Sequence, residues 1–372
     1  MATQRRNGVQ AEPPRVARDE LTAPPEISRA GLRRRLLILL GVILAVVAVI
    51  TLVPGLASLR SRFAHADPTW LVAGAALKVL SGACYVAVFR AVFCTGMRWR
   101  MSSEIGFSEL GANALFPTGG AGGLALGAWA LHRSGMSNER IARRSVAFFL
   151  LTSVPNVAGV IILGFGLAAG VFPGRASLAL TLIPAAVATA AVLATIAAGR
   201  WAERAQQRAH HSRGPGSRLA GVLGAVGSGV RESLALLRHP SPVLLVGLIG
   251  YLGFDVAILW AMFHAFGAAP PVAIISLAYL IGELGGLVPL PGGIGGVDLG
   301  LVGTLVLYHV PATEATAAVL AYRALALLVP AVIGLGAFLQ LRRSLARERI
   351  AISGCAPDGQ VEVIGRGRVR LR

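Results

Sequence analysis

The chain has 372 residues, of which 55% are hydrophobic and only 14% are charged, and its mean hydropathy is +0.69. A soluble domain carries roughly 25% charged residues, so this composition excludes an ordinary soluble protein and indicates an integral membrane protein. The net charge of +18 could suggest a nucleic-acid partner, but the basic residues lie between the apolar runs rather than in one patch. We therefore expect no nucleic-acid partner.

The apolar sequence divides into runs that predict membrane-spanning helices. The tail at residues 1–30 is polar and contains several prolines, and we expect it to be disordered. The first apolar run is about twenty residues long, which exceeds the core of a cleaved signal peptide and predicts a retained anchor. Six runs have the roughly 20 residues that a helix needs to cross a bilayer. They cover Leu36–Gly55, Trp70–Phe93, Ser145–Ala168, Ser177–Gly199, Pro242–Gly267 and Ala315–Gln340.

Two stretches rich in glycine and proline interrupt this apolar sequence. The first runs from Glu109 to Gly127 and the second from Gly282 to Gly300. Both contain, in the same order, Glu-Leu-Gly, a proline, Gly-Gly-x-Gly-Gly and Leu-Gly, so we interpret them as an internal repeat. Glycine and proline weaken a helix, and backbone groups freed inside a bilayer must be satisfied by protein or by water in a cavity. Each stretch is therefore predicted to be a re-entrant hairpin beside a cavity.

The distribution of arginine predicts the topology, because cytoplasmic loops carry an excess of basic residues. If the first glycine-rich stretch enters and leaves on one side, both tails, the Arg140 to Arg144 segment and residues 200–240 all face the cytoplasm. If the stretch crosses instead, two of these basic segments move outside, so the hairpin is favoured. For the second stretch this test does not distinguish a hairpin from two crossings, because both leave the C-terminal tail on the same side. Two crossings there would give eight in all, and Val272 to Leu290 is long enough to cross.

The predicted fold is an all-α polytopic membrane protein with six full spans and two re-entrant hairpins. Residues 31–345 form the membrane domain, with one half at 31–170 and the other at 175–345. The halves run in opposite directions, as in the inverted repeats of many secondary transporters, whose substrate binds near the midplane. A basic cytoplasmic loop at 200–240 is either a helix on the membrane surface or a solvated loop. Residues 346–372 form a basic cytoplasmic tail.

Ionisable side chains inside the membrane cost on the order of 2.5 to 3.5 kcal/mol each by insertion scales, so each is a functional candidate. Arg90 and His264 lie near the ends of predicted spans and can reach the interface, which favours a structural role. Lys78 and Asp255 lie deeper, in equivalent spans of the two halves, and can pair with each other. Glu109 belongs to the first glycine-rich stretch.

Glu283, Asp298 and Arg323 form the strongest set of candidates. The two acids flank the second glycine turn, and Arg323 lies within the final span, where it needs an anionic partner. One interpretation is a structural pair in which Asp298 holds Arg323 and so fixes the hairpin against the final span. The other is that Arg323 and the backbone amides of the glycines bind a lipid phosphate. Helix N-termini after Gly123 and Gly296 would offer free N–H groups to the same phosphate.

The second stretch and the arginine that follows it resemble the motif of the lysylphosphatidylglycerol synthase transmembrane-domain family, which consists of flippase-like membrane proteins. The family pattern is similar to proline, x, Pro-Gly-Gly, x, Gly, two residues and an acid, then an arginine in an alanine-rich span. Asp298 stands where a glutamate is more usual, and the segment from Asn113 to Pro117 is also similar to the family. The matching residues are Pro289, Pro291, Gly292, Gly293, Gly295 and Arg323.

The resemblance implies a protein that moves a phospholipid or a lipid-linked anionic head group between leaflets of the bacterial inner membrane, with both termini in the cytoplasm. About thirty residues follow the last span, so we expect no soluble synthase domain and no enzymatic activity. We also expect no metal and no cofactor, and a homodimer is compatible with the sequence. The expected substrate-binding residues are Glu283, Pro291, Gly292, Gly293, Gly295, Gly296, Asp298, Arg323, Gly119 and Gly120.

Two other functions stay open at this point. The first is a membrane enzyme that acts on a lipid-linked phosphate, with Asp298 or Glu283 as its general base. Against it, the sequence has no clustered histidines, no spacing typical of metal ligands and no acidic pair in a loop. The second is a partner protein that transports nothing and anchors a cell-envelope complex through its basic loops.

The first hairpin also lacks the acid and the arginine that the family often has there, since Ala121 to Ala130 contains neither.

Overall fold

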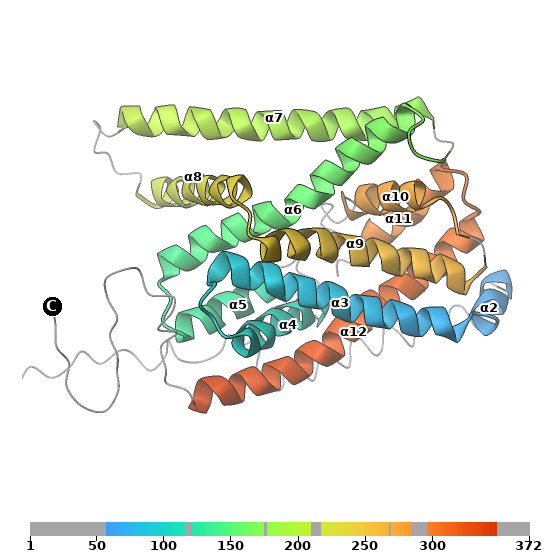
Figure 1. The fold of residues 1–372 in the computed structure, drawn as a ribbon, viewed down its shortest axis with the longest axis horizontal. Helices are drawn as coiled ribbons and strands as arrows, with labels where there is room; N and C mark the ends of the chain where they lie inside the picture. The colour runs from blue at the N-terminus through green and yellow to red at the C-terminus, as the bar shows by residue number, and fades with distance from the viewer. Residues whose placement is uncertain are drawn as a thin grey trace, which may run out of the picture. The chain divides into compact units, whose positions relative to one another are not determined.

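A computed structural model describes residues 57–115, 121–174, 177–209, 217–267, 269–284 and 296–347. These residues belong to the larger of two compact units, which covers 47–372. They form helices and no strand, which confirms the predicted all-α class (Figure 1). The predicted first span, the tail at 1–30 and the centres of both glycine-rich stretches lie outside the described residues.

The helices of the first half follow the predicted order. A short helix, α2, precedes the long helix α3. The first glycine-rich stretch begins within α4 and ends within α5, and α6 completes the half. Their bounds are Ala57–Ala64 for α2, Pro68–Phe93 for α3, Trp99–Leu115 for α4, Ala121–Arg133 for α5 and Asn138–Ala168 for α6.

The second half repeats this order after two helices that have no counterpart among the described residues of the first half. These two are α7 and α8, after which α9 to α12 correspond to α3 to α6. Their bounds are Leu178–Ala209 for α7, Ser217–Arg238 for α8, Pro242–Ala265 for α9, Val272–Leu284 for α10, Gly296–Leu307 for α11 and Ala312–Arg347 for α12.

Four of these helices, α3, α6, α9 and α12, are long and apolar enough to cross a membrane. The apolar part of α7, Leu178–Ala194, is shorter, as are the apolar helices α10 and α11. All five predicted spans within the described residues coincide with helices. The chain is therefore a multi-pass membrane protein.

Local sequence explains where α3 and α9 begin. The carboxylate of Asp67 accepts a hydrogen bond from the backbone N–H of Thr69 at 2.8 Å, and the hydroxyl of Ser241 accepts one from Leu244 at 3.2 Å. Such caps satisfy backbone donors that have no partner in the first helical turn. In both helices a proline follows the cap, at a position where its missing N–H is not needed. The same cap and proline at equivalent places extend the internal repeat beyond the glycine-rich stretches.

The two halves pack against each other through corresponding helices. Helices α3 and α9 lie antiparallel, since the N–H of Asp67 before α3 donates to the carbonyl of Ala265 at the end of α9 at 3.0 Å. Helix α4 of the first half packs on α12 of the second, and α10 of the second half packs on α6 of the first. In each half, the helix that leads into the glycine-rich stretch thus packs on the last helix of the other half.

Glycine permits both of these hairpin contacts. At the crossing of α4 and α12, a Cβ on Gly111 would lie 2.7 Å from the Cα atom of Gly334, so only glycine fits there. At the crossing of α6 and α10, a Cβ on Gly159 would lie 2.7 Å from a methyl group of Leu280. Gly159 and Gly334 hold equivalent places in the last helix of each half, which again follows the repeat.

The pair α4–α5 begins and ends at one end of the helix bundle, and the pair α10–α11 at the other (Figure 1). At the first end, Arg144 near the start of α6 donates to the carbonyl of Val92 in the last turn of α3. At the second end, Arg62 of α2 and Glu314 in the first turn of α12 form an ion pair at 3.0 Å. The two helix pairs therefore begin and end at opposite ends of the bundle.

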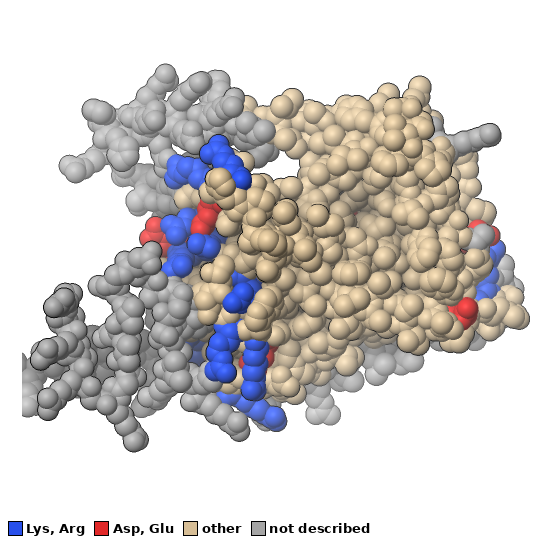
Figure 2. All heavy atoms as spheres, viewed as in Figure 1, with Lys and Arg blue, Asp and Glu red and all other residues tan. Residues whose placement is uncertain are grey.

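Basic side chains gather at the end of the bundle where α3 ends and α6 and α9 begin, as the left side of Figure 2 shows. Part of this group joins α8 to α6, because Glu232 of α8 pairs with Arg143 at 3.1 Å and also with Arg144. Within the predicted basic loop at 200–240, the described residues are mostly helical, in α7 and α8. Packing against α6 thus favours a helix over a solvated loop for α8.

Candidate functional site

Arg323 of α12 and Asp298 of α11 form the predicted ion pair, with Nε and Oδ1 3.0 Å apart. The side chains are 23% and 21% exposed. Within the part of the chain that the structure describes, Nε has no hydrogen-bond partner, so the contact is electrostatic rather than a directed hydrogen bond. Asp298 also lies in the first turn of α11, where the positive end of the helix dipole favours an acidic side chain. The predicted pair and the predicted helix N-terminus therefore coincide.

Glu283, the third predicted side chain, lies near the end of α10 and is partly buried. The charges of Asp255, Arg323, Lys78 and Asp298 all act on its carboxyl, so these side chains lie within electrostatic range. We call these five side chains the polar cluster. They come from five different helices, α3, α9, α10, α11 and α12, and they belong mainly to the second half.

The second ion pair of the polar cluster joins the corresponding helices α3 and α9. Lys78 Nζ donates to Asp255 Oδ1 at 2.7 Å, and the side chains are 10% and 6% exposed. This confirms the pairing that was predicted from their places in equivalent spans of the two halves. A small cavity with room for about one water molecule lies beside Lys78 and is lined in part by Ser81 and Tyr251. The Lys78–Asp255 pair is thus more enclosed than the Arg323–Asp298 pair.

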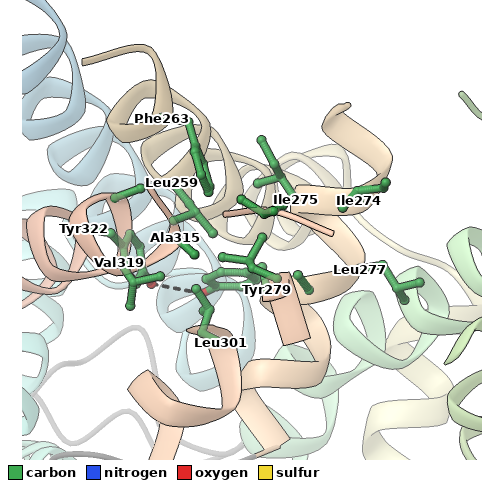
Figure 3. Close-up of a cluster of buried hydrophobic side chains, with 14 of the residues drawn as sticks. Leu259, Phe263, Ile274, Ile275, Leu277, Tyr279, Leu301, Ala315, Val319 and Tyr322 are labelled. Atoms are coloured by element: carbon green, nitrogen blue, oxygen red, sulfur yellow. Dashed lines mark hydrogen bonds between the residues drawn. The ribbon is translucent and has the colours of Figure 1, made fainter. Parts of the chain in front are cut away.

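Two tyrosines of the buried core, one of them next to Arg323 in the sequence, contact each other. The hydroxyl of Tyr322 on α12 lies 3.4 Å from that of Tyr279 on α10, and Figure 3 shows the two side chains facing each other. Leu259, Phe263 and Leu301 belong to the buried core around them. Sequence reasoning missed Tyr279, because a tyrosine in an apolar run reads as one more hydrophobic residue. Tyr322, the partner of Tyr279, directly precedes Arg323 in the sequence, and this position could have indicated that a tyrosine pair lies near the arginine.

Arg90 and His264, for which the sequence favours a structural role, both contact neighbouring residues of the helix bundle. Arg90 Nε donates to the carbonyl of Met97 at 2.7 Å, and its guanidinium lies 4.6 Å from the centre of the Trp99 ring. The ring of His264 lies 4.0 Å from the Trp260 ring, centre to centre, and its Nδ1 is 3.0 Å from the carbonyl oxygen of the same tryptophan. Both residues are held by contacts near the ends of their helices.

Several predicted binding residues lie outside the described residues, namely Pro291, Gly292, Gly293, Gly295, Gly119 and Gly120. Gly296 is the first residue of α11, as expected. In the first half, the N–H of Gly123 in the first turn of α5 donates to Oδ1 of Asn113 at 2.8 Å. An asparagine of the chain itself therefore already occupies one of the free donors that were predicted to meet a phosphate.

Together these contacts define a polytopic membrane protein that holds ionised side chains between packed helices within an apolar bundle, where such groups mark substrate or ion pathways. A comparison with family models agrees with this class. The family described as the lysylphosphatidylglycerol synthase TM region matches residues 38–334, which is most of the chain. The chain belongs to this family, whose membrane domain is related to lipids. No match was found among curated proteins or among solved structures.

Proposed function

We propose that the protein moves a phospholipid, or another lipid with an anionic head group, between the leaflets of the membrane. The observation that carries this proposal is the Arg323–Asp298 pair at the N-terminus of α11. The planar guanidinium of an arginine binds a phosphate through two N–H groups, and a helix N-terminus favours the same anion. Asp298 holds the place that such a phosphate would take. A lipid phosphate would therefore exchange with Asp298 as the partner of Arg323.

The arrangement of the helices supports a transporter-like inverted repeat with two re-entrant hairpins. Oppositely inserted hairpins would give the observed packing of each hairpin helix on the last helix of the other half. Helix α10 has 13 residues and is about 20 Å long, which is short of the hydrocarbon core of about 30 Å. We therefore propose a hairpin rather than two crossings for α10 and α11, from the length of their described parts. With Leu36–Gly55 as a further span, the fold would have six spans and two hairpins.

The charges of the polar cluster bear on the substrate. When all five side chains are ionised, three acids face two bases and leave one excess negative charge. A head group with one phosphate and one amine has no net charge, so with its phosphate at Arg323 and its amine at Glu283 it would leave this excess of one negative charge. A head group with a phosphate alone would raise the excess to two negative charges, which protons bound by the polar cluster would offset. Both kinds of head group belong in the test of transport.

The proposed orientation places the arginine-rich end of the bundle in the cytoplasm, because cytoplasmic loops carry the excess of basic residues. In a bacterial inner membrane this end would also meet anionic head groups, which attract basic segments near the surface. Both termini would then be cytoplasmic, and the pair α4–α5 would enter from that side.

We propose transport without covalent chemistry. A membrane enzyme that acts on a lipid-linked phosphate is the alternative, with Glu283 or Asp298 as its base. An envelope partner that transports nothing is a further alternative. The first would change the lipid composition of vesicles on thin-layer analysis, whereas a transporter would leave the composition unchanged and alter only the distribution between leaflets.

The experiment that tests transport uses purified protein in phospholipid vesicles. The probes are phosphatidylglycerol and phosphatidylethanolamine with a fluorescent acyl chain, and dithionite, which does not cross the membrane, bleaches the probe in the outer leaflet. Vesicles with the protein should expose probe from the inner leaflet faster than vesicles without protein. Equal rates for both lipids in the two kinds of vesicle would contradict the proposed function.

A further inference from the structure

The first half encloses a polar site that the proposed lipid site does not use. Glu109 of α4 is 4% exposed, and its Oε2 accepts a hydrogen bond from the hydroxyl of Tyr85 on α3 at 2.9 Å. On the other side, a Cβ on Gly127 of α5 would lie 1.5 Å from Oε1. The carboxyl group therefore lies directly against the backbone of α5, in a space that exists because residue 127 has no side chain.

Among the described residues, this carboxyl has no compensating positive charge beside it. Within the described residues, α5, α6, α9 and α12 bring no charged side chain close enough to act on Glu109, and Tyr85 is the titratable group that faces it. Behind Tyr85 lie the rings of Tyr251 on α9 and Phe148 on α6, with ring centres 5.6 Å and 5.2 Å from that of Tyr85. Within the part of the chain that the structure describes, Glu109 is thus a buried acid whose hydrogen-bond partner is the neutral Tyr85.

The internal repeat shows how this environment differs from the polar cluster. Glu109 corresponds to Glu283, since each begins a Glu-Leu-Gly. When α6 and α12 are aligned on Gly159 and Gly334, the place of Arg323 is taken in the first half by Phe148, which packs edge-on against Tyr85. When the two Leu-Gly pairs are aligned, the place of Asp298 is taken by Ala125. The first half has kept the glutamate and has neither the arginine nor the acid.

We propose that Glu109 is a proton-binding site and that proton uptake and release there are coupled to lipid movement at the second half. Burying an ionised carboxylate without a cation is strongly unfavourable, so the enclosed group holds a proton instead. Oε2 is held by Tyr85, which leaves Oε1, the oxygen that faces α5, as the site for this proton. The proton comes from water and returns to water, and no bond of the lipid changes.

The position of Glu109 indicates how the two events can be linked. The carboxyl lies between both helices of the hairpin, and α4 also packs on α12, which carries Arg323. Separation of α4 from α5 would admit water to Oε1 and favour ionisation, and the same movement of α4 would shift the packing of α12. The coupling rests on the proposed lipid transport, whereas the proton site itself does not.

Infrared spectroscopy of the purified protein in lipid tests the proton site without any transported lipid. The wild type at neutral pH should show a carbonyl stretch of a protonated carboxylic acid that is missing in Glu109→Gln and displaced in Tyr85→Phe, which removes the hydrogen bond. Glu104→Gln is the matched control, because Glu104 lies on the same helix, is 3% exposed and pairs with Arg100 at 3.0 Å. An unchanged protonated-acid band in Glu109→Gln would overturn the proposal.

A pH gradient across the vesicles tests the coupling. With the membrane potential clamped by potassium and valinomycin, fluorescent phosphatidylglycerol should move at different rates with and without the gradient in the wild type and in Glu104→Gln. In Glu109→Gln the two rates should be equal. The coupling would be overturned if the wild-type rate were the same with and without the gradient, or if the gradient still changed the rate in Glu109→Gln. A wild type that moves no probe would contradict the proposed function, while the infrared result still decides the proton site.

Discussion

Replacing Arg323 by alanine is expected to slow lipid movement by about one to two orders of magnitude. A hydrogen bond between a charged group and its partner contributes about 1.5 to 3 kcal/mol, and about 1.4 kcal/mol corresponds to a factor of ten. The guanidinium is the group of α12 that pairs with Asp298 in the resting structure and would bind the phosphate during transport. The alanine variant loses this contact with the substrate, so its rate of lipid movement should fall by the same factor.

The loss of stability in this variant should be small. The side chains of Arg323 and Asp298 are 23% and 21% exposed, so water screens their attraction, and exposed ion pairs contribute about 0 to 1 kcal/mol. Asp298 also keeps the favourable field of the α11 N-terminus after the arginine is removed. We therefore expect a folded protein in the membrane with a clear defect in transport.

The pair of Arg62 and Glu314 provides the matched control, because its atoms are also 3.0 Å apart and its side chains are 31% and 29% exposed. It joins α2 to α12 at the end of the bundle, so Arg62→Ala should leave the dithionite assay unchanged. A charge exchange, Arg323→Asp with Asp298→Arg, separates the two functions of the pair. If the pair is only structural, the exchange restores the wild-type rate and the reasoning is refuted. If Arg323 binds the lipid phosphate, the exchanged protein stays slow.

The remaining predictions concern packing and topology. Lys78→Met should lower the unfolding temperature in detergent, because it leaves the carboxylate of Asp255 buried and unpaired at a cost of about 3 to 5 kcal/mol, and a second change, Asp255→Leu, should recover much of the loss. Gly111→Ala should destabilise the protein by pressing a Cβ against the backbone of Gly334, whereas Gly336→Ala, where the same Cβ would meet nothing within 4 Å, should not. A site for a sequence-specific protease should be cut from the cytoplasmic side when inserted after Gly135 and from the opposite side when inserted after Gly170, two exposed glycines in loops at the two ends of the bundle. Cleavage of both from the same side would exclude the proposed topology. Gly292→Val or Gly295→Val should abolish transport, as the motif predicts, and normal lipid movement in both would remove the second glycine turn from the site.

Apolar runs and charges at membrane depth were sufficient to predict most of the long helices and both ion pairs of the polar cluster. Helix α4 was harder to predict, because it begins at Trp99, ten residues before Glu109, in a segment with several serines and two glutamates. In the structure, the hydroxyls of Ser102 and Ser108 donate to backbone carbonyls one turn earlier, which satisfies these polar groups within the helix. Local hydrogen bonds of this kind leave no periodic signal in the sequence.

The contact between Glu109 and Tyr85 was unpredictable for a related reason. A buried acid signals its need for a partner, but a neutral partner such as a tyrosine cannot be told from the apolar residues around it in the sequence. Ion pairs are easier to predict because only a few opposite charges exist at membrane depth. Lys78, the only lysine of the chain, and Asp255 illustrate this.

The two halves have the same order of helices and differ in what surrounds the carboxyl group of the corresponding glutamate. In the second half, Glu283 lies in the field of two acids, Asp255 and Asp298, and of two cations, Arg323 and Lys78, so an incoming head group can exchange with the charges around it. In the first half, Phe148 stands in the place of the arginine and packs on Tyr85, so the acid can only become neutral by binding a proton. Introducing the missing cation by Phe148→Arg should therefore remove the protonated-acid infrared band of Glu109. A band that persists in a folded Phe148→Arg protein would show that burial alone, and not the missing arginine, sets the protonation of this site.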